Sequence, residues 1–207
     1  MTPRIKNCVE RARHYQDKIL REISKHQTAD GSDRSVVATA GIKMAAGDFK
    51  AILTEIDNDN PGSAFKLFRL LYEDVVNALW AQAFAPEDLI AKLLHTDNGQ
   101  LPGTMAERAE KLDTIFVAPS DVETDDDDTL FVHLQSKFWK TANSFTHGGS
   151  LAINRELAGY DEESTYEMLR SSTTVFLILI DAMYRLHYNK PNDVLSGIAQ
   201  TYFAEKW

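Results

Sequence analysis

A histidine directly before two glycines is the feature of this sequence most suited to chemistry. The residues are His147, Gly148 and Gly149, and they follow the run Asn143-Ser-Phe-Thr. Because glycine readily takes the left-handed conformation that ends many helices, we expect His147 to lie in the last turn of a helix. The dipole favours an imidazolium there, and a histidine that titrates near neutral pH can act as a general base or acid. The alternative is a structural role, in which the imidazole bonds free carbonyls at the helix end.

Polar side chains accompany this histidine on one side of the predicted helix. The helical projection separates an apolar face from a polar stripe. The stripe consists of Lys137, Lys140, Asn143, Ser144 and His147. Lysines beside a titrating histidine suit a phosphate, because they stabilise charge that develops on its oxygens. We therefore predict catalytic roles in metal-independent RNA cleavage for His147, Lys140 and Asn143, with Lys137 and Ser144 as binding residues.

A pair of opposite charges interrupts the most apolar helical segment. Arg69 and Glu73 are four residues apart, so their side chains are neighbours on a helix. Since partly buried charges need partners, one interpretation is a structural ion pair. The other is an internal polar site facing His147, in which Glu73 orients the imidazole or Arg69 holds an anion. A small-molecule or metal site inside the bundle is a further form of this second interpretation.

Two groups of residues resemble motifs of bacterial all-helical families of unknown function. The first is Phe65–Glu73 with Ala78-Leu-Trp80, and the second is Phe138-Trp-Lys140 with Asn143–Gly149. The resemblance covers residues 33–185, and the families look like a distant branch of the HEPN-type helical bundles. Some of those bundles act in abortive infection and toxin–antitoxin systems. For this chain the resemblance implies RNA as the ligand, a homodimer, and an antitoxin or another defence protein as a partner.

One position departs from the HEPN pattern. HEPN ribonucleases carry R-x(4–6)-H, and with six intervening residues this sequence has Lys140 before His147. A lysine supplies the charge of an arginine but lacks its planar fork. The resemblance therefore implies an RNA-binding protein with weak or degenerate endoribonuclease activity. The alternative is a non-catalytic bundle that regulates by homo-oligomerisation or partner binding, for which the aromatic residues Tyr202, Phe203 and Trp207 are the motivation.

Helical periodicity runs through the whole chain and predicts the elements that hold these residues. Helices are expected at residues 3–26, 33–56, 63–84, 86–94, 104–116, 129–146, 151–157, 161–187 and 191–207. The third is apolar nearly all round, so it is expected at the centre of a bundle. The sequence contains no strand alternation of useful length. We predict an all-α fold: a single-domain, HEPN-like helical bundle over residues 1–207, with about eight or nine helices and an acidic loop at residues 117–128.

Composition and charge exclude several other classes of protein. The net charge of −9 argues against broad binding to duplex nucleic acid but is compatible with a local basic groove. A single cysteine, Cys8, excludes an internal disulfide and a cysteine-based zinc site. The longest apolar run, Val175–Ile180, is too short to span a bilayer, and the first residues contain no secretory signal. The single cysteine favours a reducing compartment, so we predict a cytoplasmic protein without membrane contact. We also predict no cofactor and no metal ligands, since phosphate loops and histidine pairs at metal spacing are absent.

Overall fold

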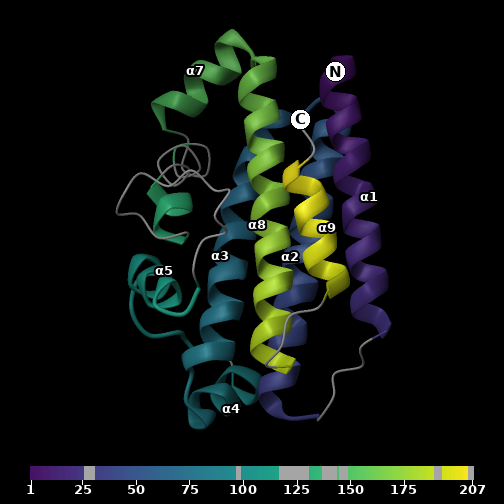
Figure 1. Ribbon diagram of the computed structural model, residues 1–207. Coiled ribbons are helices and arrows are strands. Elements are labelled where there is room, and N and C mark those ends of the chain that lie inside the picture. Colours follow the sequence, from purple (N-terminus) through teal and green to yellow (C-terminus); the bar gives the residue numbers. More distant parts are fainter. Residues whose placement is uncertain are drawn as a thin grey trace.

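Long helices that pack side by side dominate the structure (Figure 1). The computed structural model describes residues 1–25, 31–96, 99–116, 131–136, 144, 149–188 and 193–204. The helices are α1 (Pro3–Lys25), α2 (Asp33–Asp57), α3 (Pro61–Phe84), α4 (Glu87–His95), α5 (Met105–Asp113), α7 (Ser150–Ala158), α8 (Glu162–Tyr188) and α9 (Asp193–Ala204). Residues 131–136 are also helical, and no residue in the described ranges lies in a strand. The all-α bundle predicted from the sequence is confirmed.

The long helices form the bundle and the short ones pack around it. α3 contacts both α2 and α8, and α1 packs on the other side of α2 and α8 (Figure 1). α9 lies against α1 and α8, α5 lies beside α3, and α4 and α7 lie toward opposite ends of the bundle (Figure 1). None of the helices in the described ranges is both long enough and apolar enough to cross a bilayer.

Several predictions concern residues outside the described ranges. The acidic loop at 117–128 belongs to them, as do the side chains of Tyr202, Phe203 and Trp207. Of the helix predicted at 129–146, residues 131–136 and Ser144 are described, and all of these are helical. The extent of a single domain over residues 1–207 stays a prediction.

Capping residues begin several helices where the sequence predicts them. The hydroxyl of Thr104 accepts the N–H of Glu107, and the Glu107 carboxylate accepts the N–H of Thr104, which forms the expected capping box of α5. Pro3 begins α1 as predicted, and Pro61 begins α3 two residues before the predicted start at residue 63. Proline suits this first helical position because its missing N–H has no partner within the helix.

The cap of α2 is one residue away from the prediction. The sequence indicates Asp33 as the cap, but the hydroxyl of Ser32 accepts the N–H of Ser35 at 3.2 Å, and Asp33 is the first helical residue. Both residue types can cap a helix, so the local pattern does not distinguish them. A carboxylate in the first turn still interacts favourably with the helix dipole.

A glycine lets the two central helices approach closely. A Cβ atom at Gly41 of α2 would lie 2.3 Å from the Cβ of Ala78 on α3, which no packed pair tolerates. The two helices therefore come nearer here than any residue with a side chain allows. This seam between α2 and α3 separates the two regions of the molecule that carry its distinctive side chains.

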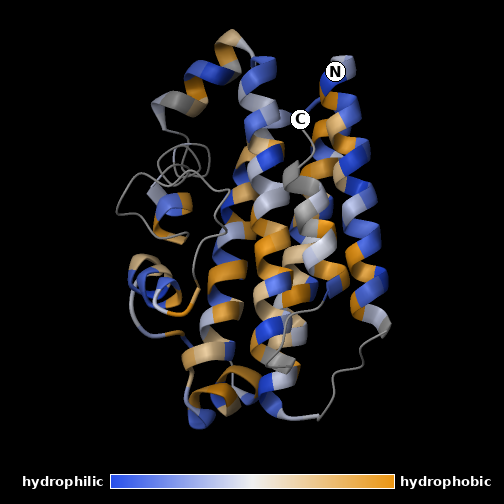
Figure 2. Cartoon of the chain, viewed as in Figure 1, coloured by the Kyte–Doolittle hydropathy of each residue, from blue (hydrophilic) through white to orange (hydrophobic). Residues whose placement is uncertain are grey.

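Apolar side chains fill the interior in two clusters. The larger cluster draws on α1, α2, α3 and α8, and in it the rings of Phe49 and Phe176 stack with centroids 4.8 Å apart. The smaller cluster lies under α4 and surrounds Trp80 and Ile90. Figure 2 shows the hydrophobic stripe that α1 turns toward the bundle and the hydrophilic residues on its outer side. Each fully buried large side chain contributes about 1.5–3 kcal/mol, so this core fixes the helices that carry the polar residues.

An arginine from α2 closes the end of α3. The guanidinium of Arg34 donates to the carbonyls of Ala81 at 2.9 Å and Ala85 at 2.6 Å, and it also pairs with Glu87 at 2.6 Å. The last carbonyls of a helix have no partner within the helix, so these bonds satisfy groups that otherwise need water. The sequence analysis did not anticipate this contact.

Candidate functional site

Some of the candidate residues lie outside the described part of the chain. They are Lys137, Lys140, Asn143 and His147. Their catalytic and binding roles stay predictions, as does the contact expected between His147 and α3. The structure describes the other three candidates, which are Arg69, Glu73 and Ser144.

The ion pair expected on α3 is present. The Nε of Arg69 donates to Oε1 of Glu73 at 2.7 Å, and the two side chains are 20% and 25% exposed. The pair therefore stands at the margin of the core rather than inside it. Partial burial makes the pairing stronger than at an open surface, but it leaves both groups within reach of solvent or a ligand.

A second arginine lies near the pair and was missed by the sequence analysis. Burial lowers the pKa of the guanidinium of Arg108 on α5, and the electrostatic interaction with Glu73 acts in the opposite direction. The NH1 group of Arg108 donates to the carbonyls of Pro102 at 3.0 Å and Gly103 at 2.8 Å. Its Nε is buried and has no hydrogen-bond partner among the described residues. We call Arg69, Glu73 and Arg108 the α3–α5 polar cluster.

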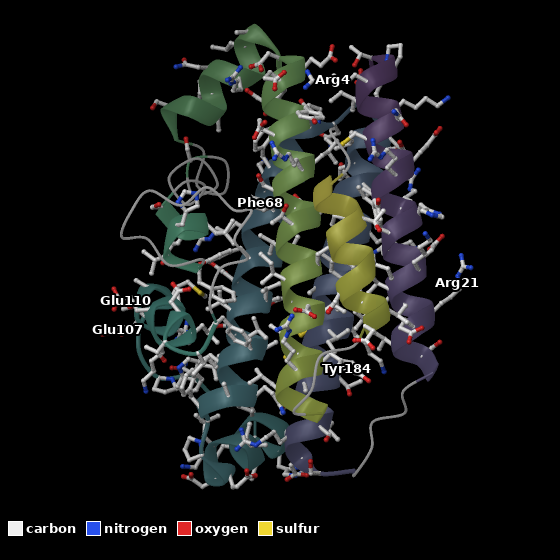
Figure 3. The ribbon with its side chains drawn as sticks, viewed as in Figure 1. Arg4, Arg21, Phe68, Glu107, Glu110 and Tyr184 are labelled. Atoms are coloured by element: carbon white, nitrogen blue, oxygen red, sulfur yellow. The ribbon has the colours of Figure 1, made fainter. Side chains whose placement is uncertain are left out.

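Glu107, next to Arg108 on α5, adds negative charge near this cluster. Glu107 and Glu110 lie on α5, on the side of the bundle where that helix packs beside α3 (Figure 3). The Glu107 carboxylate is held by the backbone and hydroxyl of Thr104, and these bonds lower its pKa. Glu107 is thus engaged in the helix cap. The sequence analysis predicts Lys137 and Lys140 as cations for a phosphate ligand, and that role stays a prediction.

The start of the segment that leads to these lysines is anchored on α3 and α5. The hydroxyl of Tyr72, next to Glu73 in the chain, donates to the carbonyl of Phe131 at 2.9 Å. The carboxylate of Asp113 accepts the N–H groups of Phe131 at 2.8 Å and Val132 at 2.9 Å. Burial raises the pKa of the Tyr72 phenol, so this hydroxyl stays a donor. Residues 131–136 therefore begin beside the α3–α5 polar cluster.

Ser144 has a structural role at the start of α7. Its carbonyl accepts the N–H of Gly149 at 2.7 Å, and its hydroxyl accepts the N–H of Ala152 at 3.4 Å. Gly149 caps α7 with φ −68°, so it does not take the left-handed conformation considered for it, while Gly148 lies outside the described residues. A Cβ at Gly149 would lie 2.7 Å from the Ser144 hydroxyl, which explains a glycine at this position. These bonds give no support to Ser144 as a binding residue, and that role stays a prediction.

Two aspartates form a hydrogen-bonded pair between α2 and α3. Burial is the main cause that raises the pKa of Asp74 to about 7, and the charges of Asp48 and Glu73 add to it. Burial also raises the pKa of Asp48, while its bond to Asp74 acts in the opposite direction. Like charges at this distance do not both ionise easily, so the pair holds a proton close to neutral pH. This pair was not predicted, because the two positions belong to different helices and no local pattern relates them.

A small cavity adjoins the aspartate pair. It has a volume of about 240 Å³ and is lined by Asp74, Asn77, apolar residues of α2, α3 and α4, and Leu101 from the segment between α4 and α5. The Oδ1 atom of Asn77 is buried without a hydrogen-bond partner among the described residues. The part of the chain that the structure describes contains no group of three or more metal-ligating side chains. The pair is consequently a proton-binding site at the α2–α3 seam, close in sequence to Arg69 and Glu73.

Comparison with known proteins gives one match. The model of a family of unknown function, DUF6988, matches residues 42–204. The matched range includes α3, α5 and the whole segment from Phe131 to His147, and it begins within α2. No curated protein and no solved structure matches the chain. The resemblance to HEPN bundles stays a prediction.

Proposed function

The chain belongs to the family of unknown function DUF6988, and we propose that it binds single-stranded RNA, as a HEPN-like bundle, between α3 and residues 137–147. The observation that carries the proposal is the buried Nε of Arg108, which lies beside the Arg69–Glu73 pair and has no hydrogen-bond partner within the described ranges. A buried donor without an acceptor costs about 1–3 kcal/mol, so an anionic ligand that accepts this N–H is favoured. A cytoplasmic location and an antitoxin or defence partner are further parts of the proposal, and they rest on the sequence resemblance.

Arginine and lysine bind the RNA phosphates in different ways in this proposal. The planar guanidinium of Arg108 suits two oxygens of one phosphate, whereas Lys137 and Lys140 act as point charges along the backbone of the RNA. The chain has a net charge of −9, so binding is confined to this local site and weakens steeply with salt. The anchoring of residues 131–136 beside α3 supports the proposal, because Lys137 follows this segment directly.

Weak cleavage of the bound RNA is the finer part of the proposal. His147 accepts the proton of a ribose 2′-hydroxyl, whose oxygen then attacks the adjacent phosphorus. Lys140 stabilises the charge on the phosphate oxygens and Asn143 positions the phosphate. The bond to the 5′-oxygen breaks, that oxygen takes a proton from water, and the products end in a 2′,3′-cyclic phosphate and a 5′-hydroxyl.

A cleavage assay with two histidine variants tests the proposal. Purified protein is incubated with labelled single-stranded RNA, and His147→Ala is compared with His133→Ala, which changes a half-buried histidine of the 131–136 segment. We expect about a hundredfold or greater loss of cleavage for His147→Ala, in the range for a general base, and little change for His133→Ala. Equal activity of the two variants would contradict a catalytic His147, and the absence of RNA binding by the unaltered protein would overturn the whole proposal.

A partner-binding bundle is the second candidate function, favoured by α7. Ile153 and Leu157 of this helix are 54% and 82% exposed, and their spacing of four residues puts them on one face. A second copy of the chain that covers this face gives the homodimer expected from the sequence. Light scattering on the unaltered protein and on Ile153→Asp tests it: a dimer that becomes a monomer supports this candidate, and a monomer in both cases removes it.

A further inference from the structure

An apolar cavity lies between α1, α2, α8 and α9, away from the α3–α5 polar cluster. Its volume is about 480 Å³. The apolar residues on its wall are Leu20 and Ile23 of α1, Ile42 of α2, Ile180 and Met183 of α8, and Leu195 of α9. Tyr184 of α8 also lines it and marks its place near the lower ends of α8 and α9 (Figure 3). The size is within the range of small-molecule sites, which is roughly 300–1,000 Å³.

Small residues on α2 explain why the side chains of the described residues do not fill this space. Ser35, Ala38, Thr39 and Ala46 form much of the α2 wall, and their spacing puts them on one stripe of the helix. The amide of Gln16 on α1 donates to the carbonyl of Ala46 at 2.9 Å, which joins α1 to α2 at that level. The helices are therefore held in place while the side chains between them are too short to meet.

One cation stands among the apolar wall residues. Lys43 of α2 is exposed, and among the described residues no carboxylate forms an ion pair with it. The hydroxyls of Ser24, Ser35, Thr39 and Tyr184 are the other polar side-chain groups that line the cavity. An apolar interior with a single ammonium group at an exposed position is complementary to a molecule with an aliphatic chain and an anionic head.

We propose that this cavity binds a small aliphatic carboxylate, with its chain between α1, α2, α8 and α9 and its carboxylate at Lys43. The aliphatic chain supplies most of the affinity, because it leaves water for an apolar wall. The carboxylate supplies orientation, since an exposed ion pair adds little free energy. This inference is independent of RNA binding, because no residue of the α3–α5 polar cluster lines the cavity.

Calorimetric titration of the full chain with decanoate tests the proposal. We expect saturable binding, about fivefold weaker for Lys43→Gln, which is the limit for one exposed ion pair. Lys50→Gln is the matched control, because it removes an exposed lysine of α2 that does not line the cavity, and its affinity is expected to stay unchanged. Decanol, which has the same chain without the charge, is expected to bind Lys43→Gln and the unaltered protein equally.

Two variants that fill the cavity distinguish it from an unspecific apolar surface. Ala38→Phe and Thr39→Leu place larger side chains on the α2 wall, and circular dichroism shows which of them is folded. If it is folded, Ala38→Phe is expected to lose measurable decanoate binding. A folded Thr39→Leu is expected to bind decanoate at least about tenfold more weakly than the unaltered protein. Unchanged affinity in a folded variant overturns the proposal, as does the absence of saturable decanoate binding by the unaltered protein.

Discussion

The two sides of the α2–α3 seam differ in chemistry. The α3–α5 polar cluster, toward α5, and the aspartate pair, at the seam itself, bring arginines and carboxylates to the margin of the core. Toward α1, α8 and α9, the described residues leave a cavity with an apolar wall and a single lysine. Of the two central helices, α3 carries the Arg69–Glu73 pair, whereas α2 forms one wall of the cavity. We expect mutations of charged residues to affect the polar cluster and mutations that change side-chain size to affect the cavity.

The largest effect is expected at the seam itself. Gly41→Ala forces the helices apart at Ala78, and overpacking of this kind costs about 1–3 kcal/mol, so both regions lose stability together. Gly47→Ala is the matched control: it lies on the same helix in open space, and removing a helical glycine there stabilises by about 0.5–1 kcal/mol. Urea unfolding measures both. Equal free energies of unfolding for the two variants would show that the seam is not closely packed.

Opposite outcomes for these glycines are informative, because the sequence treats them alike. Periodicity, prolines and capping boxes are local, so they predicted nearly every helix of the bundle. The faces by which two helices meet depend on how each helix is rotated about its axis. No local sequence pattern predicts that rotation. Arg108 beside Glu73, Asp48 beside Asp74 and the Arg34 cap on α3 were missed for this reason. Arg69–Glu73 was predictable because both residues lie on one helix.

The next effect is the pH dependence of stability that Asp74 causes. The folded state raises the pKa of Asp74 to about 7 from an ordinary value of 3.8, so between these values it binds more protons than the unfolded state. Its contribution is therefore fully present below about pH 4 and is lost as pH rises through 7. Asp74→Asn keeps a neutral group there and is expected to raise the free energy of unfolding at pH 8 by about 1 kcal/mol, after a discount for solvent screening.

Thermal unfolding between pH 4 and pH 8 measures this difference. Asp17→Asn is the control, since it removes an exposed carboxylate of α1 on the other side of the seam, and the pH dependence of its stability is expected to match that of the unaltered protein. If Asp74→Asn were no more stable than the unaltered protein at pH 8, the protonated aspartate pair would be refuted.

A smaller effect is expected from the ion pair of the polar side. Arg69→Met removes the 2.7 Å partner of Glu73 and is expected to cost about 1 kcal/mol, because both side chains are partly buried. Arg185→Met removes the comparable pair with Asp181 on α8, where the arginine is 52% exposed, and about 0.3 kcal/mol is expected. Double-mutant cycles with Glu73→Gln and Asp181→Asn isolate the two pair energies. A larger coupling on α8 would reverse the comparison.

The most direct measurement compares, in RNA binding, Lys140, which we propose as an RNA contact, with Lys43 of the cavity wall. Fluorescence anisotropy with labelled single-stranded RNA gives the affinity and its salt dependence for Lys140→Gln and Lys43→Gln. We predict that Lys140→Gln weakens binding by about tenfold and lowers the slope against salt by about 0.7, the value for one lost phosphate contact, while Lys43→Gln changes neither. Equal effects of the two lysines, or no RNA binding by the unaltered protein, would contradict an RNA site on the polar side.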